Sequence, residues 1–256
     1  MGRTMTVATP LPELLERLRS HGLRRGVPQG PMAPRGALPS GQPALDEALR
    51  SGGWPRGALA LLDAPPGGGA TTLALGSLAA AQAAGGVVAY LDPSGSLDPA
   101  TADRLGVRLE WLLVVRPADV AETLELAAWL ARDGRVDAMV LDLAAAPAPR
   151  GLDRLARLLA RSGGVTLLLA AGGGREQAGI RVRLRRRAWL AAGRDLVGQR
   201  VEAVVERHRW ALAGGRAELD LFFSEGRRAD PLLRAAATPL AEERAEALPA
   251  LRVVGA

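Results

Sequence analysis

The sequence predicts an α/β fold in which helices flank a largely parallel β-sheet, extended towards its C-terminal end by an antiparallel β-meander. Several strand-like segments are apolar along both faces and alternate with helical segments, as in a parallel sheet that is covered on both sides. A glycine-rich turn joins the first of these segments to a helix, and from residue 180 onward strand-like segments follow one another without a helix between them. With 256 residues, 48% of them hydrophobic, the chain can bury a substantial core.

Residues 1–35 are expected to form an N-terminal helix and a linker. Thr9 can cap a helix over residues 9–20, in which four leucines form an apolar stripe at helical spacing: Leu11, Leu14, Leu15 and Leu18. This stripe needs a partner, either the protein's own core or another subunit, and we treat it as a candidate protein-binding helix. Residues 22–39 are rich in Gly, Pro and Arg without a period, which is typical of a linker.

A core is expected over residues 36–226, and a tail that docks or binds a partner over residues 227–256. The patterns predict helices over residues 44–50, 71–84, 118–132 and 152–161, and strands over residues 59–63, 87–92, 136–142 and 165–171. The meander strands are expected over residues 180–189, 200–210 and 216–223. In the tail, Thr238 can cap a helix and Pro239 suits its first position, so a helix is expected there that ends before Pro249.

The composition excludes several kinds of chemistry. All 33 residues of the Lys+Arg class are arginine, which gives a net charge of +6 and a pI of about 11.1. Lysine-based catalysis is therefore excluded, and the absence of cysteine excludes disulfides, thiolate nucleophiles and Cys-ligated metals. No apolar run approaches the ~20 residues of a transmembrane helix and no signal-peptide pattern is present, so we expect a cytoplasmic protein.

The glycine-rich turn between strand and helix is the expected place for a phosphate. Aligned on the pattern G-x-x-x-x-G-K-[ST], the stretch from Ala64 to Thr71 has Ala70 in the lysine position. The chain has arginine and no lysine, so a general replacement of lysine by arginine would have put arginine at position 70. The lost charge costs on the order of several kcal/mol of phosphate binding. The candidate nucleotide site, with Asp142 where a carboxylate would hold Mg²⁺, comprises Gly67, Gly68, Gly69, Ala70, Thr71, Thr72 and Asp142. We expect weak ATP binding at most, with no other cofactor and no hydrolysis.

The first meander strand carries a row of arginines. Its residues alternate, so that Val182 and Leu184 face one side of the sheet while arginines face the other. The row is either a solvated face balanced by Glu202 and Glu206 on the next strand, or a surface for an anionic partner such as DNA phosphate or an acidic protein patch. Its members are Arg181, Arg183, Arg185 and Arg187. Without interleaved stacking aromatics, any DNA binding is expected to be non-specific.

A series of short motifs runs through residues 36–226. In order, they are Leu38-Pro39-Ser40-Gly41, Leu45-Asp46-Glu47-Ala48-Leu49, Gly52-Gly53-Trp54-Pro55-Arg56-Gly57, Tyr90-Leu91-Asp92, Leu97-Asp98-Pro99, Leu105-Gly106-Val107, Trp111-Leu112-Leu113, Gly134-Arg135-Val136-Asp137, Ala178-Gly179-Ile180-Arg181 and Phe223-Ser224-Glu225-Gly226. In order and spacing this series resembles the ATPase core of bacterial RecA recombinases. The resemblance implies a RecA-like, P-loop NTPase core around the glycine-rich turn.

The chain departs from that family at the residues that carry its function. In RecA-type enzymes a glutamate two residues after the aspartate that matches Asp92 activates the attacking water, whereas this chain has Ser94, which cannot act as a general base near neutral pH. The Asn-Gln pair that senses the terminal phosphate is replaced by Ala171-Gly172, and the segments that match both DNA-binding loops, 144–150 and 174–178, are short. The resemblance therefore implies a pseudo-ATPase without catalytic residues.

A shortened RecA relative of this kind is similar to the ImuA family, accessory proteins of SOS-induced mutagenesis and translesion synthesis after DNA damage. That resemblance implies a non-catalytic adaptor between RecA, the inactive Y-family polymerase homologue ImuB and an error-prone replicative-type polymerase, with inhibition of RecA filaments as one consequence. The residues themselves leave two alternatives. One is a residual RecA-type ATPase that uses Thr71 and Asp142, and the other is a basic DNA-binding repair module that uses the arginine row.

Overall fold

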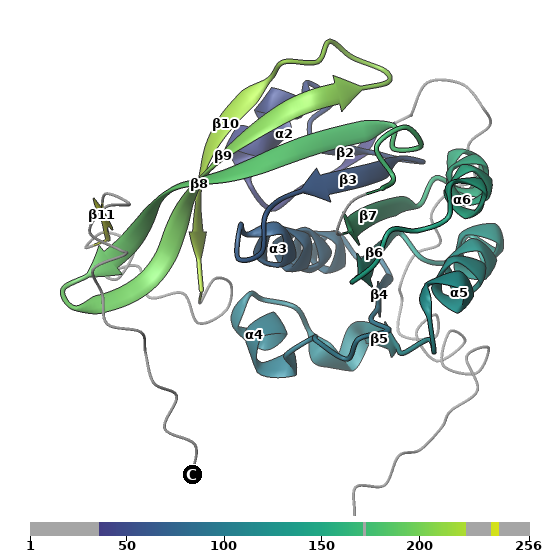
Figure 1. Cartoon of the computed structure of the whole chain (residues 1–256), viewed down its shortest axis with the longest axis horizontal. Helices are drawn as coiled ribbons and strands as arrows, with labels where there is room; N and C mark the ends of the chain where they lie inside the picture. The colour runs from purple at the N-terminus through teal and green to yellow at the C-terminus, as the bar shows by residue number, and fades with distance from the viewer. Residues whose placement is uncertain (1–35, 171–172, 224–236, 241–256) are drawn as a thin grey trace, which may run out of the picture.

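A computed structural model describes residues 36–170, 173–223 and 237–240 (Figure 1). The predicted N-terminal helix with Leu11, Leu14, Leu15 and Leu18, and most of the predicted linker and tail, lie outside the described residues. In the part of the chain that is described, no helix is long and apolar enough to cross a membrane.

Nine strands of the described residues form one mixed sheet, in the order β10-β9-β8-β3-β7-β6-β4-β5 with β11 paired to β8. Its parallel part comprises β3 (Leu59–Asp63), β4 (Val88–Leu91), β5 (Leu112–Val115), β6 (Ala138–Leu143) and β7 (Val165–Ala170). The first meander strand, β8 (Ile180–Ala192), joins parallel to β3, and β9 (Asp195–His208) and β10 (Arg216–Phe222) continue antiparallel. The predicted parallel sheet with an antiparallel extension is confirmed.

Helices cover the parallel strands on both faces (Figure 1). One face packs against α3 (Ala70–Ala83) and α4 (Pro99–Arg104), and the other against α5 (Val120–Asp133) and α6 (Pro149–Ser162). Helix α2 (Pro43–Leu49) packs against the antiparallel strands β9 and β10. Each face has its own cluster of buried apolar residues, so a central strand such as β4 is buried at all four positions. This two-sided burial explains why the strands are continuously apolar rather than alternating.

Several short elements were not predicted from the sequence. They are β1 (Ala37–Leu38), β2 (Trp54–Pro55), α4, the 3₁₀ helix η1 (Leu109–Trp111) and β5. The pairing of β1 with β2 brings the last residues of the predicted linker into the fold. The fully buried Trp54 supports this pairing, since its Nε1 donates to Ser77 Oγ at 3.0 Å and Ser77 Oγ donates to the Ser40 carbonyl at 2.8 Å. Segments this short carry too few residues to show a period.

The helix predicted to begin at Thr238 is wrong at its first residues. Thr238 and Pro239 lie in β11 (Thr238–Leu240), which pairs antiparallel with the far end of β8, Leu240 opposite Trp189. Proline is tolerated there because an edge strand has donors that need no partner in the sheet. A free sheet edge, which the local sequence does not reveal, therefore outweighs a good helix-capping signal.

Candidate functional site

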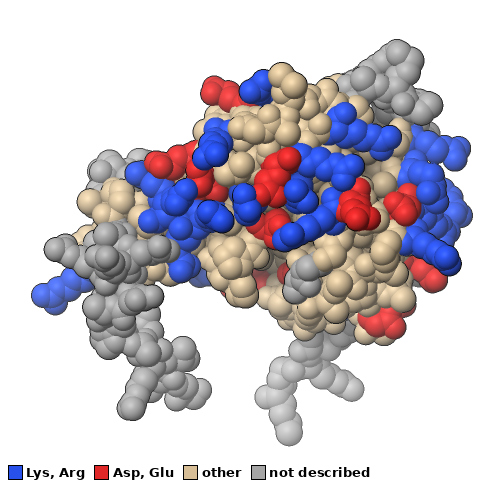
Figure 2. Space-filling model, turned by 45° about the horizontal axis from the view of Figure 1, so that its top comes forward, with Lys and Arg blue, Asp and Glu red and all other residues tan. Residues whose placement is uncertain are grey.

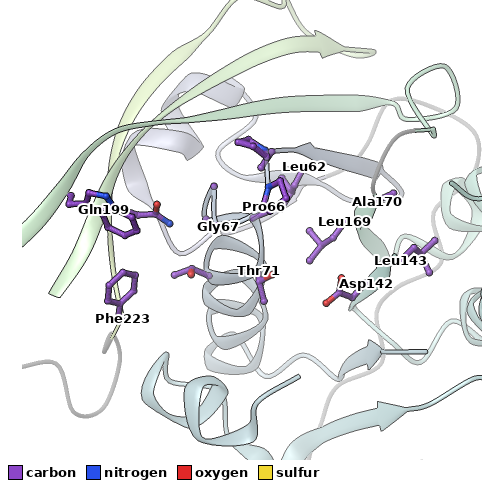
Figure 3. Close-up of a pocket in the computed structure, with 17 residues that line it drawn as sticks. Leu62, Pro66, Gly67, Thr71, Asp142, Leu143, Leu169, Ala170, Gln199 and Phe223 are labelled. Atoms are coloured by element: carbon purple, nitrogen blue, oxygen red, sulfur yellow. The ribbon is translucent and has the colours of Figure 1, made fainter. Parts of the chain in front are cut away.

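A cavity of about 460 Å³, here named the glycine cavity, opens at the carboxyl ends of β3, β6 and β7 (Figure 3). The structure brings all the predicted nucleotide-site residues to its walls: Gly67, Gly68, Gly69, Ala70, Thr71, Thr72 and Asp142. The ends of β6 and β7 add an apolar wall, and three residues reach it from the meander: Trp189, Gln199 and Phe223. The carboxyl edge of a parallel sheet is the usual position for a ligand in such folds.

Backbone geometry gives the loop its shape. Gly67 and Gly69 have φ values of 70° and 91°, in the left-handed region that favours glycine. Gly69 directly precedes α3, and a Cβ at this position would lie 2.6 Å from Leu221 Cδ1 and 3.0 Å from Gln199 Nε2. The first N–H groups of α3 have no acceptors within the helix and carry its positive dipole end, so the backbone suits an anion.

The charges that normally accompany such a loop are differently arranged. Ala70, the first residue of α3, presents a methyl group to the cavity. A cation approaches instead from β8, where Arg186 Nη1 lies 3.9 Å from the place of a Cβ on Gly67 and the guanidinium carbon lies 4.3 Å from the centroid of the Trp189 ring. Sequence reasoning missed Arg186. By alternation this residue falls on the same face of β8 as Val182 and Leu184, so a charged residue among apolar positions was the signal that could have identified it.

Two hydroxyl groups donate to the carboxylate of Asp142. Asp142 Oδ2 accepts hydrogen bonds from Tyr90 Oη at 2.7 Å and from Ser96 Oγ at 3.2 Å. Burial, followed by the charge of Asp142, raises the pKa of Tyr90 far above its usual range, so the phenol stays protonated and donates. Thr71 and Asp142 present oxygen atoms of the kind that Mg²⁺ prefers, but one carboxylate oxygen of Asp142 is already engaged.

Ser94 faces the buried Asp92. Its Oγ lies 3.1 Å from Asp92 Oδ1, and the backbone N–H groups of Ser96 and Leu97 donate to the same carboxylate at 3.0 and 2.8 Å. Burial alone would raise the pKa of Asp92, but these hydrogen bonds outweigh it and lower the pKa. Asp92 therefore organises its own turn, and Ser94, which the resemblance to RecA-type enzymes matches with a catalytic glutamate, is part of that turn.

Gln199 and Phe223 reach the glycine cavity from the side opposite to Asp142 (Figure 3). Gln199 is 3% exposed, and its Oε1 has no hydrogen-bond partner among the described residues. Trp189 and Phe223 pack edge to face with their centroids 6.4 Å apart. The meander thus supplies aromatic and amide groups, which sequence reasoning missed because only the long-range pairing of β8, β9 and β10 brings them to the loop.

The predicted arginine row on β8 has the expected alternation, with Val182 and Leu184 fully buried and Arg183 and Arg185 exposed. Glu206 on β9 forms ion pairs with both Arg181 and Arg183, with 2.7 Å between Arg181 Nε and Glu206 Oε2 and 2.6 Å between Arg183 Nη2 and Glu206 Oε1. Arg187 pairs with Glu202, which also lies opposite Arg185 in the strand register. Three of the four arginines of the row, Arg181, Arg183 and Arg187, are therefore paired with carboxylates of the neighbouring strand.

Comparison with known proteins agrees with this geometry. The model of the RecA N-terminal domain matches residues 31–153, which include the glycine loop and Asp142. The chain is 34% identical over 235 residues to RecA of Thermus thermophilus. The matched region covers 76% of this chain and 68% of that protein. It is 30% identical over 251 residues to RecA of Acidothermus cellulolyticus, with 83% and 73% of the two chains covered. From this similarity over more than two thirds of both chains, and from the sheet and loop described above, we conclude that the chain belongs to the RecA family.

Proposed function

We propose that the chain is a non-catalytic RecA-family adaptor of the ImuA type, which acts in SOS mutagenesis and translesion synthesis. One observation carries this proposal: the glycine cavity keeps the backbone of a phosphate loop while Ala70 and Ser94 stand where RecA-type ATPases use lysine and glutamate. The loop conformation depends on the packing of Gly69 against β10, so the fold can retain it after the chemistry is lost.

The side chains around the loop support the absence of hydrolysis. Removing a single group that stabilises developing charge lowers an enzyme's rate by a factor of about 10²–10³, and here the lysine and the base are both replaced. Ser94 cannot take a proton from water at neutral pH, and its hydroxyl contacts Asp92. We therefore place no catalytic residue in this chain.

The proposed partners are RecA, the inactive polymerase homologue ImuB and an error-prone replicative-type polymerase. Membership of the RecA family supports a surface that can engage a RecA subunit. A subunit that docks on a RecA filament without its own working ATP site would cap the filament or disrupt it. In this way the adaptor would modulate RecA while it recruits the polymerase complex.

Binding and strand-exchange assays test the adaptor function. Immobilised purified chain should retain RecA or ImuB from solution, and excess chain should lower RecA strand exchange at least twofold. A matched control is bovine serum albumin at the same concentration. Failure to retain either protein, together with undiminished strand exchange, would contradict the proposal.

A second candidate function is nucleotide binding without hydrolysis, favoured by the position of Arg186 beside Gly67 and by the buried Gln199 amide. Arg186 supplies a guanidinium on the loop side of β8, although at a different place from the missing ammonium. Calorimetry with millimolar ATP should then show binding that Arg186→Ala weakens at least fivefold. Arg185→Ala, one residue away and exposed, is the control and should change affinity less than twofold. Absence of measurable ATP binding would remove this candidate.

A further inference from the structure

A second cavity, of about 480 Å³, lies at the other end of the sheet, and we name it the arginine cavity. Gly57, just before β3, and Gly179, just before β8, both line it, so it sits at the amino ends of these parallel strands. The glycine cavity follows the opposite end of β3, about 16 Å away by the rise of a five-residue strand. The arginine cavity is named for five lining residues: Arg56, Arg157, Arg161, Arg207 and Arg209.

The charge in this cavity is mostly not balanced by ion pairs. Arg56 donates to the buried Asp137 at 3.0 Å, and Arg207 Nη1 donates to the carbonyl of Glu176 at 2.8 Å, a neutral group that leaves the guanidinium charge uncompensated. Within the described residues, Arg157, Arg161 and Arg209 form no ion pair with a carboxylate. Two acidic residues also line the cavity, Asp153 and Glu176, so the cations remain in excess.

The exposed face of helix α6 carries a row of arginines beside the cavity. Its buried face holds Leu152, Leu155 and Leu159, whereas arginines recur every three or four residues along its exposed face: Arg150, Arg154, Arg157 and Arg161. Figure 2 shows basic side chains concentrated at the right-hand edge of the view, on the side where Figure 1 places α6, while blue and red alternate over the middle of the molecule. Like charges at this spacing repel one another unless an anion lies among them.

An aromatic ring lies among these arginines. Trp210 lines the cavity and is partly buried, and the guanidinium carbon of Arg209 is 5.9 Å from its ring centroid. The ring is held in place by His208, edge to face at 6.2 Å, and by Gly179, where a Cβ would lie 3.0 Å from Trp210 Cη2. A fixed indole beside cations is the arrangement on which single-stranded bases stack while their phosphates are neutralised.

We propose that the arginine cavity is a binding site for a nucleotide unit, with phosphate held by Arg157, Arg161 and Arg209 and the base stacked on Trp210. The unit belongs either to a single-stranded nucleic acid or to a free nucleoside triphosphate, which share this chemistry. A cavity of about 480 Å³ admits a ligand of this size. An acidic peptide would satisfy the charges but leave Trp210 unused, and a duplex keeps its bases stacked within the helix. The site is separate from the glycine cavity and independent of the proposed function.

The test compares two double variants of α6 with the same change in charge. Binding of fluorescein-labelled dT15 to the full chain is followed by anisotropy over a series of salt concentrations. Arg157→Glu with Arg161→Glu should weaken binding at least tenfold and reduce the slope of log K against log salt by about 1.4, as expected for two lost phosphate contacts on a single strand. The control is Arg150→Glu with Arg154→Glu, outside the cavity, and should weaken binding less than threefold. Equal losses in both variants would overturn the proposal.

Further arms identify the source of the phosphate and the role of the ring. Trp210→Leu, checked by circular dichroism for folding, should weaken dT15 binding at least fivefold. ATP that competes with dT15 and loses its affinity in the Arg157→Glu/Arg161→Glu variant would assign free nucleotides to this cavity as well. ATP binding that responds only to Arg186→Ala would place free nucleotides in the glycine cavity and leave the strand as the ligand here. Competition by poly-glutamate as strong as by dT15 would overturn the proposal.

Discussion

The glycine cavity and the arginine cavity lie at opposite ends of the same strand and are built in different ways. The glycine cavity is formed mainly by backbone, through left-handed glycines and the first turn of α3. Its side chain at position 70 is the methyl group of Ala70. Side chains make the arginine cavity, on a surface helix and at the end of a meander strand. The comparison teaches that backbone packing, here of Gly69 against β10, can fix the shape of a loop whatever side chain stands at position 70, whereas the arginine cavity depends on the side chains that line it.

The largest effect is expected when a positive charge is introduced into the glycine cavity. Ala70→Lys should tighten ATP binding by about 2 kcal/mol, roughly 30-fold, because a charged donor then faces the phosphates. Isothermal calorimetry measures the change, and Ala83→Lys at the exposed end of α3 is a control of equal charge. Unchanged affinity in Ala70→Lys would mean that the loop is not shaped for phosphate.

A second prediction concerns the anchor of the arginine cavity. Asp137 is 4% exposed and accepts from Arg56 Nη1 at 3.0 Å and from the Val87 N–H at 3.1 Å. Asp137→Ala leaves both donors without this acceptor and should lower the free energy of unfolding by about 2 kcal/mol. Urea denaturation measures this loss, which should be smaller in Asp137→Asn because the amide oxygen still accepts. Equal stability of Asp137→Ala and the unmodified chain would contradict the prediction.

The row on β8 sharpens the comparison because Arg181, Arg183 and Arg187 form ion pairs, whereas Arg157, Arg161 and Arg209 of the arginine cavity form none with a carboxylate of the described residues. Arg183→Ala breaks a partly exposed pair with Glu206 and should change the free energy of unfolding by less than about 1 kcal/mol. It should also change dT15 affinity less than threefold, whereas Arg161→Ala should weaken it more. Equal weakening by the two substitutions would show that the row on β8 binds the strand too.

The smallest expected effect is a pH dependence at His208, which packs against Trp210 of the arginine cavity. Burial lowers the pKa of His208 below its usual 6.5, and its Nδ1 accepts from the Trp210 N–H at 3.2 Å. As the pH falls below 6.5, the unfolded chain takes up a proton at this histidine more readily than the folded chain, so stability decreases. Between pH 7.5 and 5.5 the loss should be about 1 kcal/mol or less. Urea denaturation of His208→Gln should show a shallower decrease, and an unchanged slope would contradict this assignment.

The sequence predicted those features that local patterns determine. Continuous apolar segments separated by helices predicted the parallel sheet, and the glycine turn before Thr71 predicted the loop at its carboxyl edge. Thr238 was assigned to a helix because its capping chemistry is local, whereas its pairing with β8 depends on an edge more than 40 residues away in the chain. Local pattern is therefore sufficient for the longer buried elements and insufficient for sheet edges and for two-residue strands such as β2.

The composition of both cavities was less predictable for the same reason. Gln199 and Phe223 reach the glycine loop only through the register of the meander strands. The arginine cavity combines a residue before β3, the exposed face of α6 and the end of β9, segments that no period or motif relates. Arg186 is the exception, because its charge interrupts an apolar face that the sequence itself displays.

The central claim is that this member of the RecA family does not hydrolyse ATP, and phosphate release measures it most directly. The purified full chain is incubated with millimolar ATP, Mg²⁺ and single-stranded DNA, with a catalytically active RecA as the positive control. We predict no release above the buffer rate, with or without DNA, because Ala70 and Ser94 supply neither the charge nor the base. Steady turnover that Thr71→Ala abolishes would contradict the claim, since it would place a working ATPase site at the glycine loop.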